Sequence, residues 1–207
     1  MHSLLMSITA LSLLTGNLEA DPSLLIVTTE YLAEHSYVLP LYVQKKEERG
    51  FRVRVVTEAD YGAAQDVGAP RFRAIRAYLQ AHHHDFRYAL LIGDPHPQYG
   101  TIPMATVWPR HELPADNCLG FGLDCRFIES DFLYAELSGN WDRNENGRLG
   151  ETILDEGPDG LDTEVELLVG RLPLPFDDVR DLDVLLRYSW AHDGALSGPA
   201  QQRIILA

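Results

Sequence analysis

The sequence predicts an α/β fold in which helices flank a parallel β-sheet. Short β-branched apolar runs recur along the chain, amphipathic segments separate them, and glycine or proline ends most of them. Strands that are separated by helices pair in parallel through right-handed crossover connections. With 207 residues, the chain is long enough for one substantial domain, or for one small domain and part of another.

The first half of the chain predicts a βαβαβ unit. Ligand sites in parallel sheets lie beyond the carboxyl ends of the strands, and Gly93 and Asp94 occupy such an end. No GxGxxG motif follows the first apolar run, which argues against a dinucleotide site. The expected strands are residues 24–28, 51–56 and 88–92, and the expected helices are residues 37–49 and a segment that opens with Pro70.

The second half predicts two more strands and a helix. A long connection rich in proline and glycine, residues 95–130, precedes them. The expected strands are residues 131–137 and 165–169, and the helix follows Asp177, which is placed to cap it. A last apolar run, residues 203–207, resembles the start of a buried strand, and from it we expect that the chain is truncated.

The chain is strongly acidic, with 31 Asp and Glu against 17 Lys and Arg and a net charge of −14. Nucleic-acid binding needs a basic face, so this charge argues against a nucleic-acid partner. The acidic residues are concentrated in residues 128–166, where solvent or a bound cation must relieve the repulsion between carboxylates. The charge fits a soluble exported protein or one that binds cations.

The N-terminus resembles an export signal. Residues 4–14 form a short apolar run, and residues 18–20 resemble a cleavage site that ends in a small residue. This pattern predicts a signal peptide over residues 1–20 and a secreted or extracytoplasmic mature chain without a membrane span. The alternative is a buried first helix, because residues 1–3 contain no Lys or Arg.

The two cysteines, Cys118 and Cys125, are separated by six residues. This spacing matches neither a CxxC redox site nor a zinc knuckle. In an oxidising compartment the pair is a candidate for a local disulfide, and two unpaired thiols are the alternative.

The most specific local motif lies in the acidic segment, where D-x-N-x-N-G matches the first half of an EF-hand-type calcium loop. Oxygens at alternate positions converge as the backbone curls, and the glycine permits a sharp turn. Ile153 replaces the glutamate that closes an EF-hand loop, so we predict a calcium loop on another scaffold. The alternative is a turn rich in Asp, Asn and Gly that binds no metal. The candidate ligands are Asp142, Asn144, Asn146, the carbonyl of Arg148, and Glu151, with Asp131, Asp155 or Asp162 to complete the shell.

Several segments of the chain, in order, resemble the gingipain-type cysteine peptidase family. Residues 129–142 read E-S-D-F-L-Y-A-E-L-S-G-N-W-D, and N-E-N-G and G-E follow, which is close to a signature of that family. The V-G-R-L-P segment ending at Pro173 and the helix through Tyr188 are similar to the family segments that come next. Upstream, L-L-I-G-D and T-I-P are similar to family segments that precede the signature.

The resemblance implies a caspase-like α/β fold in two subdomains. Residues 21–130 then form the first subdomain, and residues 131–207 begin the catalytic subdomain, which is incomplete. It also implies export, a structural calcium ion, and cleavage of protein or peptide substrates, usually after a basic residue. The alternative is a non-catalytic calcium-binding or interaction module on the same scaffold.

The family's catalytic histidine lies in a G-H-G turn, and its nucleophilic cysteine follows. Both come after the strand that matches residues 203–207, so we expect them beyond Ala207. No catalytic or substrate-binding residue is therefore assigned within the chain. We expect the fragment itself to be an inactive part of a cysteine peptidase.

Overall fold

The computed structural model describes residues 22–109, 126–157 and 160–195 of the chain. The predicted signal peptide, the two cysteines and the expected strand at residues 203–207 lie outside the described residues. Within the described ranges, none of the helices has the length and apolar character that a membrane crossing requires.

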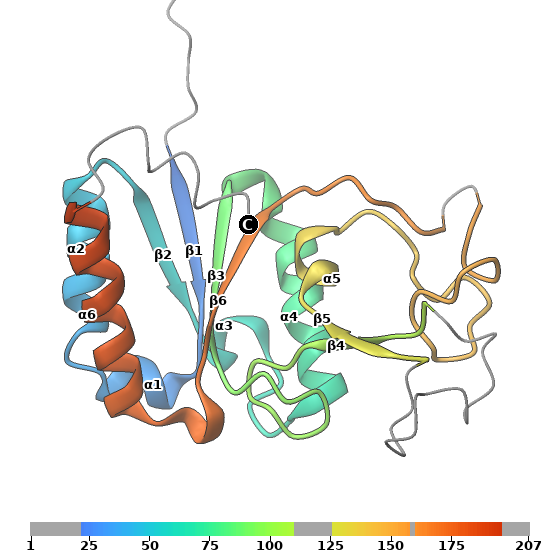
Figure 1. Cartoon of the computed structure of the whole chain (residues 1–207), viewed down its shortest axis with the longest axis horizontal. Coiled ribbons are helices and arrows are strands. Elements are labelled where there is room, and N and C mark those ends of the chain that lie inside the picture. The colour runs from blue at the N-terminus through green and yellow to red at the C-terminus, as the bar shows by residue number, and fades with distance from the viewer. Residues whose placement is uncertain (1–21, 110–125, 158–159, 196–207) are drawn as a thin grey trace, which may run out of the picture.

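Four parallel strands form the central sheet (Figure 1). In spatial order they are β2 (Arg52–Val56), β1 (Ser23–Val27), β3 (Tyr88–Gly93) and β6 (Leu168–Pro173). Every pair of neighbouring strands runs in parallel. This arrangement confirms the predicted α/β fold with a parallel sheet.

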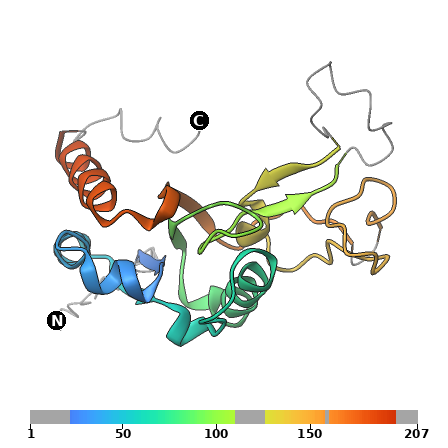
Figure 2. The same ribbon diagram turned by 90° about the horizontal axis from the view of Figure 1, so that it is seen from below.

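Helices cover both faces of the sheet (Figures 1 and 2). One face carries α1 (Glu30–His35), α2 (Leu39–Glu48) and α6 (Val179–Ala195). The other carries α3 (Glu58–Tyr61), α4 (Gly68–His82) and α5 (Phe132–Ala135). Two 3-10 turns, η1 (His83–Asp85) and η2 (Pro175–Asp177), follow α4 and β6.

The strand β1 has a buried side chain at every position, because it is central and both faces are covered. Leu25 and Val27 belong to the core beneath α4, together with Ile75. Leu24 and Ile26 belong to the core beneath α1, α2 and α6. This two-sided burial explains why β1 appears in the sequence as a continuous apolar run instead of an alternating one.

The predicted strand at residues 131–137 is wrong. The segment forms α5, and a short strand before it, β5 (Ile128–Ser130), pairs antiparallel with β4 (Ala105–Val107). The hydroxyl of Ser130 accepts a hydrogen bond from the backbone N–H of Phe132 and begins the turn. Short apolar runs do not distinguish strand from buried helix by periodicity, and tertiary contacts decided here.

One strand boundary, two short helices and one helix cap also differ from the prediction. The strand expected at residues 165–169 is β6, which begins at Leu168. The short helices α1 and α3 were not predicted, although threonine caps both of them. The side chain of Asp178, not Asp177, accepts the hydrogen bond from the N–H of Arg180 in the first turn of α6.

The predicted subdomain boundary after residue 130 stays a prediction, and described residues on both sides of it pack together. β6 lies beyond that boundary and pairs with β3 along its whole length. Leu133 and Tyr134 of α5 also join the core beneath α4. The segment that follows the boundary therefore completes the first sheet.

Candidate functional site

The candidate loop runs from Trp141 to Asp155 and is tied to the fold at its base. The N–H of Gly150 donates to the carbonyl of Trp141 at 2.7 Å. Leu149 forms a bridge with Val107 of β4, and its carbonyl accepts from the N–H of Trp108 at 2.8 Å. Gly150 has φ +73°, and a Cβ there would lie 3.0 Å from the Trp141 ring. A side chain at Gly150 is therefore disfavoured both by the backbone conformation and by the close Trp141 ring.

A buried carboxylate, Glu136, holds the turn that precedes the loop. It is fully buried and accepts hydrogen bonds from the N–H of Gly139 and from the indole N–H of Trp141. Arg76 of α4 lies 3.6 Å from this carboxylate and also donates to the carbonyls of Leu133 and Glu136. Burial lowers the pKa of the Arg76 guanidinium, and the negative charge of Glu136 opposes that shift.

Within the loop, side-chain oxygens fold back onto the backbone. The Asp142 carboxylate accepts from the N–H groups of Asn146 at 2.9 Å and Gly147 at 3.0 Å. The Asn144 amide oxygen accepts from Asn146 at 3.0 Å, and that of Asn146 accepts from the N–H of Arg148 at 2.8 Å. Gly147 has φ +81°, as the predicted sharp turn requires.

Two buried carboxylates, Glu151 and Asp155, close the loop. Glu151 is 1% exposed, and its Oε2 accepts from the amide nitrogens of Asn144 at 3.1 Å and Asn146 at 2.5 Å. Asp155 is 0% exposed and accepts from the N–H groups of Arg143 at 2.9 Å and Glu151 at 2.8 Å. Asp155 thereby joins the beginning of the loop to its end.

The structure brings most of the predicted ligands into this loop but places two elsewhere. Asn144, Asn146 and Arg148 lie around the carboxylate of Glu151, with the Arg148 guanidinium 3.7 Å away. Asp131 instead accepts two hydrogen bonds from Arg171, at 2.7 and 2.6 Å. Asp162 accepts from the hydroxyl of Ser138 and from the N–H of Glu164.

The donor set of the loop fits a hard cation in composition. Asp142 and Glu151 supply carboxylates, and Asn144 and Asn146 supply amide oxygens, which are the ligands that Ca²⁺ prefers. In this structure the amide nitrogens face Glu151, so a cation would require both amides to turn and present oxygen instead. Among the described residues, no three His, Cys, Asp or Glu side chains are grouped as metal ligands. The asparagine oxygens would therefore add to the two carboxylates in holding a cation here.

The carboxyl edge of the sheet, marked in the sequence by Gly93 and Asp94, carries a half-buried acid, Asp177. Asp177 accepts from the N–H of Asp94 and from the hydroxyl of Thr101, both at 2.9 Å. Burial raises the pKa of Asp177, and the Thr101 hydrogen bond opposes the shift. Asp94 in turn accepts from the N–H of Phe176 at 3.1 Å, so the two acids lock the loop after β6 onto β3.

Sequence reasoning missed Glu136 and Arg76, which position the loop. The available signal was an acid inside the apolar run F-L-Y-A-E-L, because a buried carboxylate needs several donors or a cation. The cysteine predictions remain untested, because Cys118 and Cys125 lie outside the described residues.

The model of peptidase family C25 matches residues 17–206 of the chain. The chain belongs to peptidase family C25. C25 is the gingipain family, so the predicted resemblance is confirmed, and the four-stranded parallel sheet with flanking helices is consistent with the expected caspase-like fold. No curated protein and no solved structure matches this C25 chain.

Proposed function

We propose that this C25 chain forms the calcium-stabilised structural part of a secreted cysteine endopeptidase that cleaves protein or peptide substrates. Family membership supports the cysteine peptidase activity. The observation that carries the structural role is the burial of Glu151 at 1% exposure inside a loop of asparagine amides. Secretion is supported by the apolar run at residues 4–14 and the small residue at position 20.

Calcium would relieve the electrostatic strain of this loop. A buried carboxylate loses its hydration and needs compensating charge or several hydrogen bonds. Glu151 accepts from the amide nitrogens of Asn144 and Asn146, and Asp142 adds a second carboxylate to the same loop, so a bound cation would balance negative charge there. Asp142, Asn144, Asn146, the carbonyl of Arg148, and Glu151 would hold the ion. A cation at this position would fasten the loop to β4, on which Leu149 is anchored.

The described residues act as scaffold in this proposal. Cysteine proteolysis needs a thiolate nucleophile, an imidazole that protonates the leaving amine, and N–H donors for the oxyanion. None of the described residues is a cysteine, and the His82 and His83 imidazoles lie at the end of α4. His96 stacks on Tyr99 with 3.4 Å between ring centroids.

Calorimetric titration of the folded chain with Ca²⁺ tests the metal. We expect binding to the unmodified chain and strong weakening in Glu151→Gln, because the variant lacks the buried negative charge. Glu156→Gln is the matched control, because Glu156 is exposed, directly follows the loop, and its replacement is expected to leave binding unchanged. Absence of calcium binding to the folded, unmodified chain would contradict the proposal.

A peptidase assay of the 207-residue chain tests the scaffold role. We expect no thiol-dependent cleavage of peptides with basic residues. Cleavage that is lost in Cys118→Ser or Cys125→Ser would show that the nucleophile lies within this chain and would overturn the scaffold assignment. Mass spectrometry of the exported protein tests secretion, with an N-terminus at Asp21 expected and one at Met1 contradicting it.

A further inference from the structure

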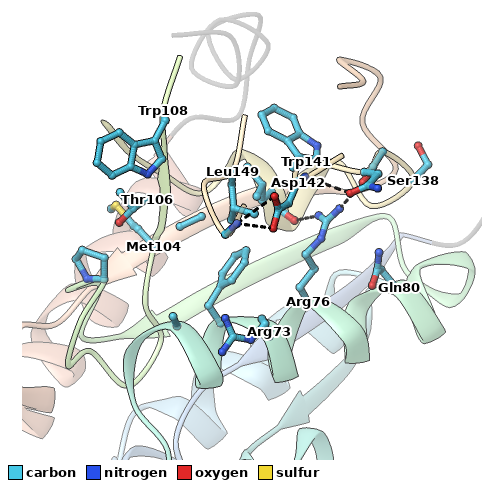
Figure 3. A pocket seen from close by; sticks show the side chains of 18 residues that line it. Arg73, Arg76, Gln80, Met104, Thr106, Trp108, Ser138, Trp141, Asp142 and Leu149 are labelled. Atoms are coloured by element: carbon cyan, nitrogen blue, oxygen red, sulfur yellow. Dashed lines mark hydrogen bonds between the residues drawn. The ribbon is translucent and has the colours of Figure 1, made fainter. Parts of the chain in front are cut away.

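A groove of about 650 Å³ lies between α4 and the base of the candidate loop (Figure 3). α4 forms its floor, the segment around β4 forms one wall, and residues 138–149 contribute the other. This volume is within the range of about 300–1,000 Å³ that is typical of small-molecule sites. The groove is separate from the carboxyl edge of the sheet, where Asp94 and Asp177 lie.

The walls of the groove are aromatic and apolar. Trp108 and Met104 line the wall near β4, and Trp141 and Leu149 line the wall near the loop. Trp141 is held in place, because its indole N–H donates to the buried Glu136. Aromatic walls of this kind provide contact area for a ring or a branched apolar group at low entropic cost.

The lining of the groove includes a guanidinium, that of Arg73, that has no acidic partner among the described residues. Arg73 lies on the α4 side, is exposed, and makes no hydrogen bond or ion pair with any residue that the structure describes. The neighbouring Arg76 is engaged by Glu136. The acid in the lining, Asp142, has its carboxylate occupied by the N–H groups of the loop.

Two more arginines lie at the Trp108 wall. The guanidinium of Arg148 is 5.0 Å from the Trp108 ring centroid, and that of Arg126 is 5.7 Å away. Arg148 is also 3.7 Å from the Glu151 carboxylate, so its guanidinium is shared between that acid and the Trp108 face. Guanidinium groups around the groove attract anions, and the guanidinium that is available to pair with one is that of Arg73.

We propose that this groove binds a carboxylate carried on an aromatic or large apolar group. Arg73 pairs with the carboxylate, and the apolar group packs between Trp108 and Trp141. A guanidinium suits this ligand because its planar fork matches a carboxylate. The proposal goes beyond the calcium and scaffold roles and depends on neither, because its recognition residues are Arg73 and the two indoles.

Three small probes with one phenyl group and different charges test the proposal. They are 3-phenylpropionate, its neutral amide 3-phenylpropanamide, and the cation 3-phenylpropylamine. Binding is followed by calorimetry and by tryptophan fluorescence, since two of the three tryptophans of the chain line the groove. We expect the carboxylate to bind on the order of tenfold more tightly than the amide, and the amine to bind most weakly.

The variant Arg73→Gln separates charge recognition from general hydrophobic binding. We expect it to bind the carboxylate no more tightly than the amide, while its binding of the amide stays unchanged. Arg187→Gln is the matched control, because Arg187 is exposed on α6 and does not line the groove. The proposal is wrong if the folded chain binds none of the probes, binds all three equally, or keeps its preference for the carboxylate in Arg73→Gln.

Discussion

Replacing Glu136 with glutamine removes the negative charge of the turn that precedes the candidate loop. Glu136 is 0% exposed, and its carboxylate accepts from the N–H groups of Ser138 and Gly139 and from the indole of Trp141. A glutamine keeps the shape but turns one acceptor into an NH₂ donor, which then faces other donors. The partly buried guanidinium of Arg76 also loses its counter-charge.

Removing one partner of a buried ion pair costs about 3–5 kcal/mol. Arg76 keeps the carbonyls of Leu133, Glu136 and Gly139 as acceptors in Glu136→Gln, so the lower end, about 3 kcal/mol, is expected. For a chain of this size each kcal/mol shifts the melting temperature by about 2–4 °C, which predicts a decrease of about 6–12 °C.

Urea denaturation followed by circular dichroism gives the free energy of unfolding, and tryptophan fluorescence reports the environment of Trp141. Glu156→Gln is the control, because Glu156 is exposed and its replacement is expected to change stability by less than about 0.5 kcal/mol. If Glu136→Gln lowers the free energy of unfolding by less than about 1 kcal/mol, Glu136 does not hold the turn as described.

Two other changes probe the loop and the edge of the sheet. Gly150→Ala is expected to lower the free energy of unfolding by about 1–3 kcal/mol more than Gly147→Ala does, as measured by urea denaturation. Both glycines have a positive φ, but of the two only Gly150 lies against the Trp141 ring. Equal losses would show that the ring yields. Burial raises the pKa of Asp177, so the folded state favours the protonated carboxyl. The stability contributed by the protonated carboxyl is lost as the pH rises through the raised pKa. Asp177→Asn keeps an oxygen that accepts from the N–H of Asp94 but does not titrate. The free energy of unfolding of this variant, relative to that of the unmodified chain, is expected to rise as the pH increases above about 4. A difference that stays constant across pH would contradict this prediction.

The central sheet could be predicted from the sequence because its strands are buried on both faces. Ile26 in β1 and Leu91 in β3 stand in short apolar runs, and such runs are typical of parallel strands between two layers of helices. The amphipathic helices α2 and α4 were found from their periodicity, since Tyr42 and Ile75 lie on buried faces.

The α5 segment could not be predicted in the same way. Phe132 to Ala135 is an apolar run too short to show a helical period, and its conformation depends on the burial of Leu133 and Tyr134 against the α4 layer. The pairing of β6 with β3 could not be predicted for a related reason, because it is a contact between segments far apart in the chain.

For the candidate site, the sequence by itself determined the motif from Asp142 to Gly147, because turn residues and their spacing are local properties. The sequence also determined the family to which the chain belongs. Only the tertiary structure decided which side chains surround that motif. It buried Glu151 and Asp155 inside the loop, paired Asp131 with Arg171, and brought Arg73 and Trp141 into the lining of one groove. These contacts join segments distant in the chain, and the packing of α4 and β4 against the loop sets them.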